Sequence, residues 1–133
     1  MPKAVARRRE GYTHDVEVDG HTLVADEPEG AGGANAGPSP TRLLASALAS
    51  CTAITVEMYA DRKGWDVGDV EVEVEMDYGK PSIPKSFLVT LKVPKELTDE
   101  QQQRLGEIGR RCPVHRVLAR DVEVEVEDRI ELV

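Results

Sequence analysis

The longest run without a charged residue lies between Leu43 and Val56. Apolar and small side chains recur there at helical spacing, and this pattern predicts a helix that is apolar or small on every side. One set comprises Leu44, Leu48, Cys51, Ile54, Thr55 and Met58, and a second comprises Ala45, Ala49 and Ala53. The uncharged run is shorter than the roughly 20 residues that a bilayer span needs, so we expect a buried core helix.

The ends of this helix are well marked. Ser39 can cap its start, and Pro40 suits its first turn. Arg62 and Lys63 complement the dipole at its C-terminal end, where Gly64 can adopt the left-handed conformation that ends a helix.

The segment before this helix predicts antiparallel sheet. Tyr12–Val18 and Thr22–Asp26 flank the hairpin dipeptide Asp19-Gly20, and Lys3–Arg9 adds a further strand. Pro28–Pro40 is rich in glycine but lacks the Lys and Ser/Thr that end a phosphate-binding loop. We expect it to be a mobile loop, able to cover a pocket at the start of the helix.

Three further strands are predicted after the helix. Val70–Asp77 and Val122–Glu127 alternate apolar and acidic residues with period two, and Ser86–Val93 pairs with the first of them. We interpret the glutamates as solvated faces of the sheet and not as catalytic acids.

A second helix is predicted to begin at Thr98, which has the capping-box spacing with Gln101. Its two glycines, Gly106 and Gly109, each cost about 1 kcal/mol relative to Ala, which suggests close approach to another backbone. Pro113 interrupts the helix, so Cys112 should lie at the N-terminal end of a short segment, a position that can lower the pKa of a thiol.

Composition limits the classes of protein. We expect residues 1–133 to form a single α+β domain, in which a second copy completes the cover of the central helix as a homodimer. The net charge of −8 disfavours a nucleic-acid binder, and we interpret the basic run Arg7–Arg9 as a surface strand edge. No apolar targeting segment follows Met1, which favours a cytoplasmic location without a membrane partner.

Cys51 and Cys112 are the candidate catalytic residues. Cys51 alone would be read as an inert core residue, but one cysteine on each of two predicted helices suggests a pair that can meet. A disulfide between them requires Cα atoms about 4.4 to 6.8 Å apart. Cys112 and His115 could share a helical face, but the spacings do not form a metal site, and a surface histidine is favoured.

A reactive Cys51 also needs a cation, because only the thiolate attacks. The start of its helix is roughly 15 Å away, and Arg42 lies on the opposite side of the helix. The arginine must come from Arg7–Arg9, from Arg110 or Arg111, or from a partner subunit.

The run GPSPTRLLASALASCTAITVEMYADRKGW together with RCPVHRVL resembles the OsmC/Ohr family of osmotically inducible and organic hydroperoxide resistance proteins. The resemblance covers nearly the whole chain. It implies an OsmC-like α+β fold, an intertwined homodimer, and thiol-dependent reduction of organic hydroperoxides. It also implies a peroxidatic Cys51, a resolving Cys112, and an external dithiol reductant of the lipoyl type. Apart from the resemblance, we expect no cofactor or metal.

The chain departs from this family in one turn. Members with peroxidase chemistry carry a Glu early in the central helix that orients a catalytic Arg, and here Thr41 and Arg42 occupy that turn. The alternative function is therefore a non-catalytic dimer that binds a small ligand or senses redox state.

Overall fold

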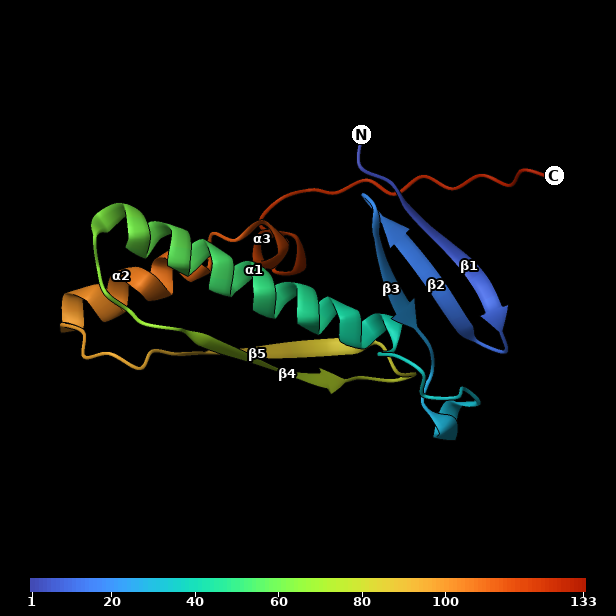
Figure 1. Cartoon of the computed structure of the whole chain (residues 1–133), viewed down its shortest axis with the longest axis horizontal. Helices are drawn as coiled ribbons and strands as arrows, with labels where there is room; N and C mark the ends of the chain where they lie inside the picture. Colours follow the sequence, from blue (N-terminus) through green and yellow to red (C-terminus); the bar gives the residue numbers. More distant parts are fainter. The chain divides into compact units, whose positions relative to one another are not determined.

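The computed structural model describes every residue from Met1 to Val133, as an α+β chain with two antiparallel sheets and a long helix (Figure 1). This confirms the fold class expected from the sequence. The chain forms two compact units: Met1–Ser46 with Glu75–Leu88, and Ala47–Val74 with Val89–Val133. Whether residues 1–133 behave as a single domain stays a prediction.

The first unit contains the N-terminal sheet. Strands β1 (Ala4–Glu10), β2 (Thr13–Val18) and β3 (His21–Ala25) are antiparallel in the order β1-β2-β3, drawn in blue in Figure 1. The turn between β2 and β3 places Asp19 and Gly20 at φ of 48° and 81°. Both residues therefore adopt the left-handed conformation that the sequence Asp-Gly predicts, and the expected hairpin is confirmed.

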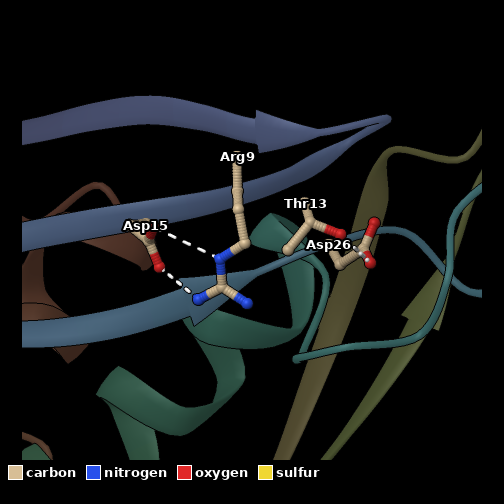
Figure 2. Close-up of polar contacts among 4 residues, drawn as sticks. All are labelled: Arg9, Thr13, Asp15 and Asp26. Carbon is tan, nitrogen blue, oxygen red and sulfur yellow. Dashed lines mark hydrogen bonds and ion pairs between the residues drawn. The ribbon is translucent and has the colours of Figure 1, made fainter.

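The glycine-rich loop after β3 is tied to the buried side chain of Asp26. This carboxylate accepts a hydrogen bond from the Thr13 hydroxyl at 2.7 Å (Figure 2). It also accepts hydrogen bonds from three backbone N–H groups, those of Glu27, Ala34 and Ala36. These bonds lower the pKa of Asp26, the Thr13 hydroxyl most strongly. The loop, which includes a short 3-10 helix at Glu29–Ala31, is thus anchored by contacts that no motif in the sequence indicates.

Helix α1 extends from Pro40 to Lys63, and Gly64 follows it at φ of 69°, as predicted. Only one face of it is buried within the chain: Leu48, Thr52, Val56 and Ala60, spaced four residues apart. Leu44, Ile54 and Met58 are exposed, so the single chain leaves part of the helix uncovered. By length and composition α1 would be able to cross a membrane, a test that the core helix of a soluble protein also passes.

Strands β4 (Glu71–Tyr78) and β5 (Pro84–Lys92) form a two-stranded sheet, joined by a turn in which the Gly79 N–H donates to the Ile83 carbonyl. Along β4 the acidic side chains are exposed and alternate with half-buried Val72, Val74 and Met76. The predicted pair of strands is confirmed.

The core of the second unit forms around Val56, Ala60, Val67 and Leu105, which are almost completely buried. Leu105 belongs to helix α2 (Asp99–Gly109), whose capping box between Thr98 and Gln101 is present as predicted. A Cβ atom on Gly109 would lie 3.4 Å from Thr52 Cγ2, so this glycine does approach α1 closely. Gly106 has only the Arg110 guanidinium near it, at 3.8 Å, and the close approach predicted there is wrong.

Helix α3 (Pro113–Leu118) begins at Pro113, as expected. The predicted strand Val122–Glu127 is not formed: the chain from residue 123 to its end has no regular secondary structure, and Figure 1 draws it as a coil. A strand needs a neighbour for its backbone hydrogen bonds, and within this chain no strand pairs with the segment.

Candidate functional site

Helix α1 carries Cys51 at the margin of its buried face. Thr52, the next residue, is 3% exposed and lies on the face that packs in the core, while Cys51 itself is half-buried. Its thiol is free. The helix thus holds a cysteine between the core and the solvent, where a small molecule can approach it.

The junction between α2 and α3 positions Cys112. Pro113 cannot continue α2, so the chain restarts there with Cys112 as the N-cap of α3. Its Sγ atom accepts a hydrogen bond from the backbone N–H of His115 at 3.2 Å, and the residue is completely buried. Cys112 is therefore fixed in orientation and shielded from solvent.

The two cysteines belong to the same compact unit and interact. The Thr52 hydroxyl lies 3.8 Å from Cys112 Sγ, which connects α1 to the α2–α3 junction. Burial raises the pKa of Cys112, and the neighbouring Cys51 thiol raises it further. The hydrogen bonds from the His115 N–H, at the helix start, and from Thr52 lower this pKa, as a helix start can, but burial has the larger effect and the net pKa is raised.

The arginines that the sequence offered as activators of Cys51 are either paired with carboxylates or exposed. On the N-terminal sheet, Arg7 pairs with Glu17 at 3.2 Å. On the same sheet, Arg9 pairs with Asp15 (Figure 2). Arg110 and Arg111 are exposed after α2. The cation that would activate Cys51 stays unassigned in the chain.

Thr41, in the turn where the resemblance implies a Glu, makes a neutral contact. Its hydroxyl lies 2.8 Å from the Tyr78 hydroxyl at the end of β4. Arg42 is exposed beside it. A hydroxyl pair of this kind carries no charge, so it cannot hold an arginine as a carboxylate would.

His115 differs from the surface histidine expected from the sequence. Its Nδ1 atom is buried and makes no hydrogen bond, while its backbone N–H serves Cys112. The side chains of His, Cys, Asp and Glu form no group of three or more that could hold a metal.

A cluster of aromatic and basic side chains, not predicted from the sequence, joins α1 to α2 through Tyr59 and Arg104. The Arg104 Nε–H donates to the Tyr59 hydroxyl at 3.0 Å, and Trp65 meets the Tyr59 ring edge-on at 5.6 Å. Lys63 lies 5.7 Å from the same ring, and the bond from Arg104 lowers the pKa of Tyr59. Tyr59 and Lys63 lie on α1, Arg104 lies on α2 and Trp65 follows the end of α1, and no motif in the sequence marks them.

Comparison with known proteins places these features in a family. The model of the family described as OsmC-like protein matches residues 32–127, which include Cys51 and Cys112. Comparison with the curated proteins gave no match.

Several solved structures are similar in fold. A protein from Psychrobacter arcticus, described as an osmotic stress induced and detoxification response protein, superposes with a TM-score of 0.81 at 22% identity, over 88% of both chains. An organic hydroperoxide resistance protein OsmC from Legionella pneumophila gives 0.65 at 20% identity, covering 87% of this chain and 88% of that one. An organic hydroperoxide resistance protein from Elizabethkingia anophelis, with thiocyanate bound, gives 0.64 at 22% identity over 88% and 86%.

Proposed function

The chain belongs to the OsmC-like protein family, and on this basis we propose that it is a thiol-dependent peroxidase that reduces organic hydroperoxides. Cys51 is the attacking thiolate and Cys112 the resolving thiol. The observation that supports this most directly is the unequal burial of two interacting free thiols, one half-buried on α1 and one completely buried at the start of α3.

The burial matches the two roles. A peroxidatic thiol must meet the substrate, and Cys51 is the cysteine that solvent reaches. A resolving thiol must wait unreacted, and its raised pKa keeps Cys112 protonated at neutral pH.

The reaction proceeds in three balanced steps. The Cys51 thiolate attacks the distal peroxide oxygen, so that an S–O bond forms, the O–O bond breaks, and an alcohol leaves after taking up a proton. The Cys112 sulfur then attacks the sulfenic acid, and the disulfide forms with loss of water. An external dithiol, of the lipoyl type by family resemblance, restores both thiols by exchange. The protein needs no cofactor or metal for these steps.

The proposed active form is a cytoplasmic homodimer. The exposed apolar side chains of α1, Leu44, Ile54 and Met58, are the surface that a second copy would cover. A helix of this composition costs free energy when it is left in water, so we expect dimerisation to accompany folding.

One observation favours the alternative, a dimer that binds a small ligand or senses redox state without turnover. Thr41 contacts Tyr78 through hydroxyl groups where a peroxidase of this family would hold an arginine with a Glu. The N-terminal unit also contains an apolar hollow of about 470 Å³ beside Tyr12, Val16 and Leu43.

Consumption of cumene hydroperoxide in the presence of a dithiol separates the two functions. For the peroxidase we expect turnover by the unaltered chain, none by Cys51→Ser, and a single turnover by Cys112→Ser that leaves a sulfenic acid reactive with dimedone. Ser50→Ala is a control that alters a neighbouring residue of α1 and retains both thiols. Equal residual activity in the two cysteine variants would contradict the assigned roles, and no turnover by the unaltered chain would favour the ligand-binding alternative.

A further inference from the structure

The second unit contains a hollow between α2 and the end of β5, which we call the α2 hollow. Its volume is about 600 Å³, and neither cysteine borders it. The apolar part of its lining consists of Leu91, Val93, Leu97 and Leu105. Pockets that hold small molecules typically measure about 300–1,000 Å³. The α2 hollow is therefore large enough for a ligand of its own, separate from the thiols.

Gly106 borders the α2 hollow from the interior of α2. Gln102, one turn earlier on the same side of the helix, borders it as well. A glycine inside a helix lowers the stability of that helix, and a positive φ or a close neighbour usually explains its presence. Gly106 has neither, because its φ is not positive and a Cβ atom there would meet only the Arg110 guanidinium, at 3.8 Å. What this glycine provides is space, which a larger side chain would take from the hollow.

The loop that borders the α2 hollow is held by contacts of its own. Lys95 Nζ lies 3.6 Å from Asp66 Oδ2, and Lys95 Cγ would lie 3.3 Å from a Cβ atom on Gly68. The Gln102 Nε2–H donates to the Leu97 carbonyl at 3.2 Å and so joins the loop to α2. The hollow is therefore present before a ligand enters, and the Lys95 ammonium already faces a carboxylate.

The polar groups left at the rim of the α2 hollow are acceptors. The Glu96 side chain borders the hollow and makes no ion pair or hydrogen bond. The Gln102 amide donates to Leu97, while its Oε1 atom accepts no hydrogen bond. Two acceptors fit a head group that donates, and the carboxylate favours a head group with a positive charge. The net charge of −8 favours the same sign.

We propose that the α2 hollow binds a small amphiphilic amine. The hydrocarbon chain of the ligand lies on the leucine and valine side chains, in the space beside Gly106, and its ammonium group donates to Glu96 and Gln102. A fatty acid fits less well, because its carboxylate would meet Glu96 while Lys95 already faces Asp66. This site goes beyond the proposed peroxidase and does not depend on it.

Isothermal titration calorimetry at neutral pH with n-octylamine, n-octanoate and n-octanol tests the charge of the ligand. The three probes share the same hydrocarbon chain and differ in the head group. The unaltered chain should bind octylamine at least roughly tenfold more tightly than octanoate, with octanol between them. Glu96→Gln removes the charge and keeps the shape of the side chain. It should weaken octylamine binding roughly threefold to fivefold, as expected for one exposed ion pair.

Gly106→Leu tests the space in the α2 hollow. The leucine should weaken octylamine binding at least roughly tenfold, because the ligand chain loses apolar contact. The same variant should melt no lower than the unaltered chain, because leucine forms helices better than glycine does. Loss of binding would then not be a loss of fold.

Two control variants make the same changes outside the α2 hollow. Gln103→Leu adds a leucine to α2, and Glu100→Gln removes one charge a turn after Glu96; neither residue borders the hollow. Both should bind octylamine like the unaltered chain. If Gly106→Leu does not fold, the comparison of Glu96→Gln with Glu100→Gln decides.

Four results would overturn the proposal: no binding of octylamine by the unaltered chain, octanoate bound as tightly as octylamine, unchanged binding by a folded Gly106→Leu, or equal weakening in Glu96→Gln and Glu100→Gln. None of them would bear on the peroxidase, which is measured by turnover of cumene hydroperoxide.

Discussion

The Thr52 hydroxyl lies 3.8 Å from Cys112 Sγ, and this contact joins the helix of one cysteine to the turn that holds the other. Thr52 is 3% exposed and follows Cys51 directly. Its hydroxyl lowers the pKa of Cys112 against the larger effect of burial, so the residue tunes the buried thiol.

We therefore expect Thr52→Val, which keeps the shape of the side chain, to raise the pKa of Cys112. The ultraviolet absorbance of the thiolate, titrated in a Cys51→Ser background, measures this directly. Loss of one weak hydrogen bond should change stability by less than about 1 kcal/mol. Thr55→Val, on the same helix, is the matched control and should leave the titration unchanged; an equal shift in both variants would argue against a direct contact.

The raised pKa of Cys112 also predicts how stability depends on pH. The folded chain holds the thiol proton more tightly than the unfolded chain does, so stability from this group is complete below the unfolded pKa of about 8.5. It is lost as pH rises through the higher folded value. Urea unfolding of the reduced chain should show stability falling more steeply with pH, between about 8.5 and the higher folded value, than in Cys112→Ala. Parallel curves would show that burial does not perturb the thiol.

Asp26 should give the opposite dependence. Its folded pKa is lowered, so its contribution is present above the unfolded pKa of about 3.9 and is lost as pH falls through the folded value. Asp26→Asn places an amide where four donors meet a carboxylate, and we therefore expect a lower melting temperature. The stability of this variant should also depend less on pH at acidic pH than that of the unaltered chain. Asp19→Asn, in the exposed hairpin turn, is the control. Similar melting curves for the two variants would contradict the role of Asp26 as the anchor of the loop.

The two glycines of α2 should respond differently to alanine. A methyl group at position 106 meets only the Arg110 guanidinium, at an ordinary contact distance of 3.8 Å, so Gly106→Ala should stabilise the chain by about 0.5–1 kcal/mol through helix propensity. At position 109 the same group would press on Thr52 at 3.4 Å, so Gly109→Ala should gain less or lose stability. The midpoints of urea unfolding of Gly106→Ala and Gly109→Ala compare the two effects. A greater gain in stability for Gly109→Ala would mean that α2 is free to move away from α1.

The features predicted well from the sequence depend on neighbours in the chain. Asp19-Gly20 fixes a hairpin through its own φ angles, and Thr98 with Gln101 caps a helix by local hydrogen bonds. Cys112 at the start of α3 follows from Pro113 alone. Such rules need no knowledge of tertiary structure.

The features missed depend on distant partners. The sequence of α1 is apolar or small on most sides, so periodicity could not select Leu48, Thr52 and Val56 as the buried face. The contacts of Asp26 with Thr13 and with the glycine-rich loop join residues far apart in sequence. Val122–Glu127 has the alternation of a strand, but whether it forms one depends on a neighbouring strand that the alternation does not identify. Cys51 and Cys112 lie in one unit, as a pair that can meet requires, while the cation that would activate Cys51 stays unassigned.

The edge-on contact between Trp65 and Tyr59 has a spectroscopic consequence. Trp65 is the single tryptophan of the chain and belongs to the second unit, whereas Tyr12 and Tyr78 belong to the first. Indole emission therefore reports the melting of one unit, and in a Tyr59→Phe background tyrosine emission reports the other. Coincident transitions would mean that 133 residues unfold as one cooperative domain, and separate transitions would give each unit a stability of its own.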